Sequence, residues 1–126
     1  MKYKFATAIN CIDGRTQKHV IDFVRRKFSV DYVDMITEPG PVKILSENKK
    51  SGITKSIKGR VMISIERHKS RVIVIVGHYD CAGNPVNEKT HRMQIKKAIQ
   101  NIDSWNLKVP VFGIWLDKDW KGAFIS

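Results

Sequence analysis

Apolar side chains recur along the chain at two spacings, every second residue in some segments and every third or fourth residue in others. Residues 3–10 place apolar or β-branched side chains at every second position, which predicts a strand. The apolar residues of segment 16–28 fall on one side of a helix instead. They are Val20, Ile21, Val24 and Phe28.

The same alternation continues through the middle of the chain. Residues 31–36 predict a second strand, which ends at the turn sequence E-P-G-P of residues 38–41. Residues 51–68 predict a helix with a single apolar stripe. The stripe consists of Ile53, Ile57, Val61 and Ile65.

The clearest predicted element is the run V-I-V-I-V within residues 71–77. A short, wholly apolar and β-branched run suits a strand that is covered on both faces, as in a parallel sheet. Residues 88–105 then predict a helix, 109–116 a fourth strand, and 117–126 a short tail or a hairpin return. The residues that this last helix is expected to bury are Met93, Ile95, Ala98, Ile99 and Ile102.

Alternating strands and helices predict an α/β fold, here a single domain over residues 1–126. We expect a mainly parallel sheet of about four strands, flanked by helices on its two faces because crossover connections are right-handed. In such sheets ligands bind beyond the carboxyl ends of the strands, near the point where the strand order reverses. Candidate functional residues should therefore be sought just after the predicted strands.

Length and composition agree with one globular domain. The chain has 126 residues, 42% of them hydrophobic, which is enough for a core without disulfides or disorder. No apolar run approaches the ~18 residues of a membrane span, and no secretory signal pattern is evident. We therefore expect a cytoplasmic protein that does not act at a membrane. The two cysteines are expected to be reduced, catalytic or metal-bound.

The net charge of +11 raises the question of an anionic partner such as nucleic acid. The basic residues are spread widely, however, and several fall on predicted helices, where solvated charge is the ordinary explanation. Aromatic residues near them, such as Tyr3 and Phe28, stand alone in the sequence and do not suggest a stacking platform. We therefore do not expect nucleic acid as a partner.

Three potential metal ligands follow two of the predicted strands. Cys11 comes after the first strand, and His78 and Cys81 come after the third. If these strands are neighbours, two thiolates and an imidazole converge, which suits zinc and leaves a fourth tetrahedral position open. The alternative is that the cysteines are packed strand-end thiols and His78 is a hydrogen-bonded turn residue. Spacing alone does not decide between these two interpretations.

The segments C-I-D-G-R and H-Y-D-C-A-G together resemble the two signatures of the β-class carbonic anhydrases, Cys-x-Asp-x-Arg and His-x-x-Cys. The order and separation of the signatures match, as does their placement after the first and third strands. The similarity extends over most of the chain, and includes D-M-I-T-E-P-G from Asp34 and the V-F-G-I-W of the fourth strand.

This resemblance implies zinc bound by Cys11, His78 and Cys81, with zinc-bound hydroxide attacking carbon dioxide to form bicarbonate. It also implies that Asp13 and Arg15 form the family's catalytic dyad, in which the aspartate orients the hydroxide. The alternative for the dyad is a functionally silent surface salt bridge. A homodimer or higher homo-oligomer is implied as well, and Trp115, Trp120 and Phe124 are candidate contact residues.

Other residues near the signatures have less specific predicted roles. Gly83 is assigned to the substrate-binding site, where it would permit close backbone approach. Asp80 is expected to cap the turn that follows it. The remaining histidines are candidates by type for a proton shuttle, but each is expected to be an ordinary surface residue. They are His19, His68 and His91.

The chain departs from the family pattern at three places. Only ten residues precede Cys11, where typical members carry a helical arm with a substrate-binding glutamine. Residues 37–41 read T-E-P-G-P where the family has a sequence like R-N-A-G-N, and Cys81 is followed by Ala82 in place of glycine. We expect these changes to leave the zinc ligands intact and to alter the substrate pocket.

Hydration of carbon dioxide is thus the leading predicted function. One alternative is the hydrolysis of another small heterocumulene, such as carbon disulfide, by the same zinc chemistry. Another is a non-catalytic zinc-binding domain of the same fold. The third, a module that binds nucleic acid or another polyanion, rests on the net charge alone and should show binding that weakens steeply with salt.

Overall fold

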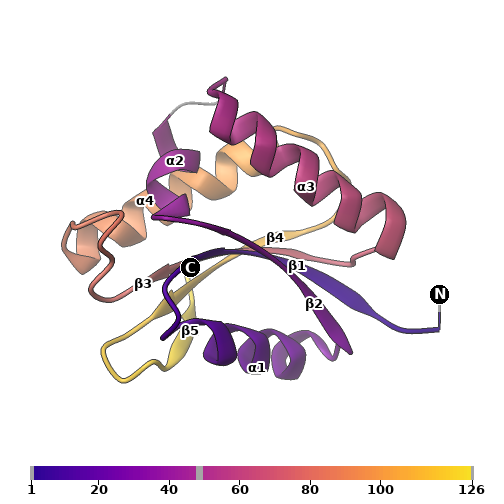
Figure 1. Ribbon diagram of the computed structural model, residues 1–126, viewed down its shortest axis with the longest axis horizontal. Coiled ribbons are helices and arrows are strands. Elements are labelled where there is room, and N and C mark those ends of the chain that lie inside the picture. The colour runs from indigo at the N-terminus through magenta and orange to yellow at the C-terminus, as the bar shows by residue number, and fades with distance from the viewer. Residues whose placement is uncertain (1, 48–49, 126) are drawn as a thin grey trace.

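The computed structural model describes residues 2–47 and 50–125, which form a five-stranded sheet with helices on both faces (Figure 1). The strand order is β2-β1-β3-β4-β5, and all pairs are parallel except β4 with β5. The strands are β1 (Phe5–Cys11), β2 (Tyr32–Glu38), β3 (Ile73–His78), β4 (Val111–Leu116) and β5 (Gly122–Phe124).

The helices are divided unequally between the two faces. In Figure 1, α1 lies under the sheet, and α2, α3 and α4 lie above it. The helices are α1 (Gln17–Phe28), α2 (Pro41–Glu47), α3 (Gly52–His68) and α4 (Glu88–Asp103). The sheet is therefore covered on both sides, as the apolar run of β3 predicted.

Alternation along the central strands supplies two separate cores. Ile73 and Ile75 of β3 pack under α2, α3 and α4, whereas Val74 and Val76 pack against α1. All four side chains are fully buried. Because successive strand residues point to opposite faces, a wholly apolar strand is the pattern that a sheet covered on both sides requires.

Side-chain caps fix where the two longest helices begin. The Ser51 hydroxyl accepts the backbone N–H of Thr54 at the start of α3. The Asn87 side-chain oxygen accepts the N–H of Thr90 at the start of α4. Each cap satisfies a backbone donor that has no partner within the helix, which typically contributes about 1 kcal/mol.

The predicted α/β fold and the order of its main elements are confirmed, with two additions. The short helix α2, which begins at the last residue of the E-P-G-P sequence, was not predicted. Its first residue is Pro41, whose fixed φ suits the first helical position. The hairpin return predicted after residue 116 is present as the fifth strand, β5, although Ser126 lies outside the described residues.

One predicted buried position is wrong, because Met93 in α4 has 63% of its surface exposed. Ile53, at the start of the predicted apolar stripe of α3, is 51% exposed. The other residues expected to be buried in these helices are at least partly covered. Hydrophobicity alone placed Met93 inside, but the side of α4 that faces the sheet passes through His91, Ile95 and Ala98.

The strand order reverses beside β1. The chain passes from β1 to β2 on one side, and then to β3 on the other. The carboxyl ends of β1 and β3 are thus neighbours at the point where such folds bind ligands. None of the helices described, in residues 2–47 and 50–125, is long and apolar enough to cross a membrane.

Candidate metal centre

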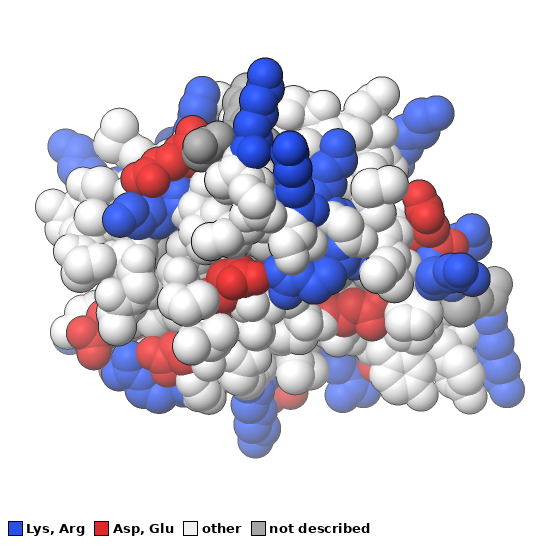
Figure 2. All heavy atoms as spheres, turned by 45° about the horizontal axis from the view of Figure 1, so that its top comes forward, with Lys and Arg blue, Asp and Glu red and all other residues white. Residues whose placement is uncertain are grey.

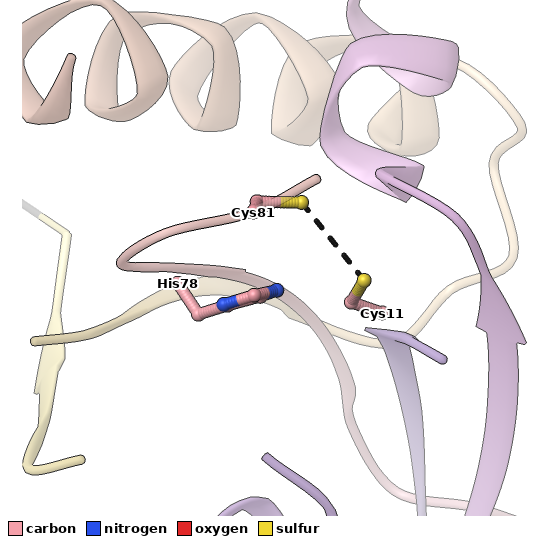
Figure 3. A group of neighbouring side chains, drawn as sticks. All are labelled: Cys11, His78 and Cys81. Atoms are coloured by element: carbon pink, nitrogen blue, oxygen red, sulfur yellow. Dashed lines mark hydrogen bonds between the residues drawn. The ribbon is translucent and has the colours of Figure 1, made fainter. Parts of the chain in front are cut away.

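Cys11, His78 and Cys81 meet at the carboxyl ends of β1 and β3 (Figure 3). Cys11 is the last residue of β1, His78 is the last residue of β3, and Cys81 lies in the loop that follows. Their potential ligand atoms all lie within 4.8 Å of one another, and all three residues are buried. The predicted convergence of the three side chains is therefore present.

The spacing of the two sulfur atoms fits a shared metal ion. The Sγ atoms of Cys11 and Cys81 are 3.9 Å apart, and both cysteines are free. A disulfide would bring them to about 2.05 Å. Two sulfurs that are each about 2.3 Å from one tetrahedral zinc ion would be about 3.8 Å apart. The observed separation matches the second arrangement.

His78 is held in the tautomer that a metal ligand needs. Its Nδ1–H donates a hydrogen bond to the backbone oxygen of Tyr79 at 2.7 Å. The Nε2 atom is buried and has no hydrogen-bond partner. An unpaired buried nitrogen is costly, and its lone pair is free to bind a metal beside the two sulfurs. This orphaned atom favours a metal ligand over a hydrogen-bonded turn residue.

The two thiols share one proton unequally. The pKa of Cys11 is lowered, first because the Cys81 thiol donates a hydrogen bond to it, against the opposing effect of burial. Backbone N–H groups of Gly40 and Asp13 lower the pKa further. The pKa of Cys81 is raised by its proximity to Cys11 and by burial. The pair therefore holds at least one negative charge, which suits a cation.

Asp13 and Arg15 form a bidentate ion pair beside the cysteines. Arg15 Nη2 lies 2.7 Å from Asp13 Oδ2, and Arg15 Nε lies 3.0 Å from Asp13 Oδ1. This hydrogen bonding lowers the pKa of Asp13 to about 2, against the opposing effect of burial. The pair that the signature predicts is therefore formed, and the carboxylate is ionised at neutral pH.

Arg15 has further contacts that sequence reasoning missed. Its Nη1 lies 3.2 Å from the Asp80 carboxylate, and its Nη2 donates to the Asp80 backbone oxygen at 3.1 Å. The guanidinium also stacks over the Trp120 ring, 5.0 Å from its centre. Asp80 was expected to cap a turn, but its carboxylate instead binds Arg15. These contacts fix the orientation of Arg15 toward Asp13.

The loop that carries Asp13 is tied to the start of α1. The Gln17 amide donates to the backbone oxygens of Cys11 at 2.8 Å and Asp13 at 3.1 Å. The buried Thr16 hydroxyl donates to the Asp13 oxygen and accepts a hydrogen bond from Asn10. Thr16 and Gln17, directly after C-I-D-G-R, therefore help to hold the site in place. A hydroxyl residue at the start of a predicted helix is the sequence feature that could have indicated Thr16.

Gly83 lies directly against the loop that follows β2. A Cβ atom on Gly83 would be 2.6 Å from the nitrogen of Gly40 and 2.6 Å from the carbonyl carbon of Pro39. Gly40 itself has a positive φ of 62°. The close backbone approach predicted for Gly83 is therefore present, and its partner is the protein's own backbone. Its assignment to substrate binding stays a prediction.

A pocket of about 240 Å³ opens beside Cys11. Its wall is mainly apolar, and its polar side chains are those of Cys11 and Asp13. The residues that line it are Cys11, Ile12, Asp13, Pro39, Ala82 and Gly83. Pro39 and Ala82 stand at two of the three places where the sequence departs from the family pattern, so those departures do shape this pocket.

The expectation that all the remaining histidines are surface residues is wrong for His91. Its side chain is buried near Gly77 and packs edge-on against Trp115, with ring centres 5.1 Å apart. Burial is the main cause that lowers its pKa to about 4, and an electrostatic effect of the nearby His78 adds to it. His19 is exposed, and His68 binds the Asp34 carboxylate far from the metal ligands.

Comparison with known proteins agrees with the family resemblance and with the observed fold. The model of the family described as "Putative carbonic anhydrase" matches residues 1–126. Among curated proteins, no sequence matches the chain. A tetrameric β-carbonic anhydrase from the filamentous ascomycete Sordaria macrospora is similar in fold, with a TM-score of 0.56 and 13% identity over 96% of this chain and 80% of that chain.

Two proteins of the fungal pathogen Aspergillus fumigatus are also similar in structure. The β-carbonic anhydrase CafA has a TM-score of 0.53 and 10% identity, over 96% of this chain and 74% of that chain. A mutant of the β-carbonic anhydrase CafD has a TM-score of 0.52 and 12% identity, over 100% of this chain and 91% of that chain. Identities this low establish a common fold and nothing finer.

Proposed function

The chain belongs to the β-class carbonic anhydrase family, and we propose that it hydrates carbon dioxide to bicarbonate with a zinc ion. Cys11, His78 and Cys81 would hold the ion. The observation that carries the proposal is their convergence, with His78 Nε2 buried and without a partner beside two sulfurs 3.9 Å apart. Three protein ligands leave one tetrahedral position for a reactant, which a catalytic zinc requires.

A zinc ion held by Cys11, His78 and Cys81 would supply a nucleophile at neutral pH, because coordination lowers the pKa of a water molecule to about 7. Asp13 is ionised and can only accept hydrogen bonds, so it can orient a donor in the pocket. Arg15 keeps that carboxylate occupied and turned away from the metal ligands. Among the described residues, the group whose potential ligand atoms lie within 4.8 Å of one another does not include Asp13, which agrees with this role of Arg15.

The pocket beside Cys11 suits a small substrate with little polarity. Ile12, Pro39 and Ala82 form apolar walls, and the Asp13 carboxylate lies at one side. Carbon dioxide has no net charge and little need for hydrogen bonds, so such walls can accept it without a desolvation penalty. The negative bicarbonate product is disfavoured beside Asp13, which would help it to leave.

The test is stopped-flow carbon dioxide hydration by protein whose zinc content has been measured. We expect one zinc ion per chain and activity that falls at least about 100-fold in Asp13→Asn, because removal of one orienting group commonly costs 10²–10³ in rate. Gly14→Ala is the matched control, since nothing lies within 4 Å of the added methyl group. A folded, zinc-loaded protein with no hydration activity would contradict the proposal.

Hydrolysis of another heterocumulene is a second candidate, because two residues that depart from the family pattern line the pocket. Pro39 and Ala82 line the pocket and are the residues that differ from the family pattern. Carbon disulfide is larger and less polar than carbon dioxide, so the same assay should include it. If the zinc-loaded protein hydrolyses carbon disulfide but does not hydrate carbon dioxide, the second candidate replaces the first. If it converts neither substrate, the protein is a non-catalytic zinc-binding domain.

We also propose a homo-oligomer. The similar Sordaria macrospora enzyme is described as tetrameric, and edge strand β5 places Phe124 and its neighbour Phe112 partly in solvent, with ring centres 5.7 Å apart. Trp115 was a candidate contact residue but is buried against His91, so it is not available for one. Sedimentation equilibrium tests this, and a monomer at assay concentration would contradict it.

A further inference from the structure

The proposed reaction at the metal centre does not account for the net charge of +11. Figure 2 shows Lys and Arg spread across the face of α2, α3 and α4, with acidic residues among them, so this face carries no single basic patch. The two ends of the sheet differ more clearly. They can be compared through the loops that join helices to strands.

The loops at the amino ends of β1 to β4 are strongly basic. Segments 2–4, 29–31, 69–72 and 104–110 contain five basic residues and one acidic residue. The basic ones are Lys2, Lys4, Lys69, Arg71 and Lys108, and the acidic one is Asp31. At the carboxyl ends, where the metal ligands lie, segments 12–16, 39–40, 79–87 and 117–121 contain three basic and four acidic residues. Most Lys and Arg lie on the helices, but among the loops those at the amino ends of the strands carry a net charge of +4, against −1 for those at the metal-centre end.

An aromatic row crosses the same amino end. The ring centres of Tyr3 and Tyr32 are 5.5 Å apart, those of Tyr32 and Phe5 are 5.2 Å apart, and those of Phe5 and His68 are 4.3 Å apart. Tyr3 and Tyr32 are each about half exposed, at 48% and 49%. Tyr3 stands alone in the sequence, but the pairing of β1 with β2 places Tyr32 in register with Phe5 and so builds the row.

Backbone contacts hold the charges and the rings on one continuous surface. The Lys4 carbonyl accepts the N–H of Tyr32, and the Phe5 carbonyl accepts the N–H of Arg71. The Lys2 ammonium lies 5.6 Å from the centre of the Tyr3 ring. We call this the amino-end surface. It consists of the rings Tyr3, Phe5, Tyr32 and His68 and the cations Lys2, Lys4, Lys69 and Arg71, together with two carboxylates, Asp31 beside Lys4 and Asp34 beside His68.

We propose that the amino-end surface binds single-stranded nucleic acid. Lysine and arginine attract the phosphates, and each base can stack on an exposed ring. Base–aromatic stacking needs accessible ring surface, and Tyr3 and Tyr32 are each about half exposed. An anionic membrane surface also attracts cations, but it favours a helix with a broad apolar face, whereas these rings belong to the ends of two strands.

The basic residues at the end of α3 have a simpler explanation, which does not extend to the rest of the surface. Arg67 and His68 occupy the last turn of α3, where cations offset the partial negative charge of a helix terminus. Lys2, Lys4 and Tyr3 precede a strand and gain nothing from a helix dipole. Their place beside Tyr32 thus calls for a separate reason, and an anionic, aromatic partner supplies one.

The experiment is fluorescence anisotropy with a labelled 20-nucleotide single-stranded poly-U and the matching poly-dT, titrated with zinc-loaded, full-length protein in 50 mM and 200 mM salt. We expect binding that weakens at least tenfold between the two salt concentrations. The double substitution Tyr3→Ala and Tyr32→Ala should weaken binding about tenfold or more, while Tyr3→Phe with Tyr32→Phe should keep it, because stacking needs only the ring.

Matched controls test whether the location matters. Tyr79→Ala removes an exposed tyrosine at the other end of the sheet, and Lys96→Ala with Lys97→Ala removes two exposed charges from α4. Both should leave binding within about twofold of the unmodified protein. Equal losses in the amino-end and control variants, no salt-sensitive binding, or tighter binding to phosphatidylserine vesicles than to the oligonucleotides would each overturn the proposal. Carbon dioxide hydration is measured separately, so either result can fail without the other.

Discussion

Gly40 and Gly83 touch through their backbones, and each lies beside a different cysteine of the metal centre. A Cβ on Gly40 would be 2.6 Å from the Gly83 oxygen, and a Cβ on Gly83 would be 2.6 Å from the Gly40 nitrogen. The N–H of Gly40 lowers the pKa of Cys11, and the N–H of Gly83 lowers that of Cys81 against larger opposing effects. The contact thus sets the positions of both sulfurs at once.

Gly83→Ala is therefore expected to weaken zinc binding without unfolding the protein. The added methyl group meets backbone atoms of Pro39 and Gly40, so the loop that carries Cys81 must shift. We expect zinc affinity to fall at least about tenfold, and stability to fall by about 1–3 kcal/mol as for other overpacked sites. Competition with a chromophoric chelator measures the affinity. Gly14→Ala, in the neighbouring loop, should change neither quantity.

Cys81→Ser should strip zinc from the protein. A serine hydroxyl is a much poorer zinc ligand than a thiolate, and the two remaining ligands would not retain the ion through a chelating column. Metal analysis after gel filtration should give close to one zinc ion per chain in the unmodified protein and in Asp13→Asn, and almost none in Cys81→Ser. A normal zinc content in Cys81→Ser would show that the ligands are assigned wrongly.

Loss of the Arg15 side chain should lower activity equally at every assay pH. The pKa of Asp13 is lowered to about 2. The charged carboxylate is therefore favoured, and it is lost only as the pH falls toward 2, far below the assay range. In Arg15→Leu the pKa of Asp13 rises toward its ordinary value of about 3.9, which is still far below pH 6. Hydration rates from pH 6 to 9 check this. Recovery of Arg15→Leu at high pH would show that protonation of Asp13 causes the loss.

His91 should make the protein less stable in mild acid. Its pKa is lowered to about 4, so between pH 4 and about 6.5 the unfolded chain binds a proton that the folded protein does not. Stability therefore falls as the pH drops through this window, by up to about 3 kcal/mol from this residue. Urea unfolding at pH 7.5 and pH 4.5 should show a smaller difference in His91→Gln than in the unmodified protein. The exposed His19 provides the control, because His19→Gln should leave the difference unchanged.

Much of the fold could be predicted from the sequence because its main elements have strong local patterns. The run V-I-V-I-V of β3 needs cover on both faces, and the chain supplies helices for both. The short helix α2 escaped prediction because seven residues span only two turns, too few to show a periodicity. Likewise, hydropathy alone could not tell that α4 turns His91, and not Met93, toward the sheet.

The sequence by itself determined the candidate site residues, in two ways. Strand ends in a parallel sheet carry Cys11, His78 and Cys81 to a common edge, and the resemblance of the two signatures to those of the β-class carbonic anhydrases added Asp13 and Arg15. The tertiary structure alone decided what surrounds them. Arg15 meets Asp80 across 65 residues of sequence, Gly40 meets Gly83, and Tyr3 meets Tyr32. Such contacts depend on strand register and loop packing, which are set by the whole core at once and leave no periodic trace in the chain.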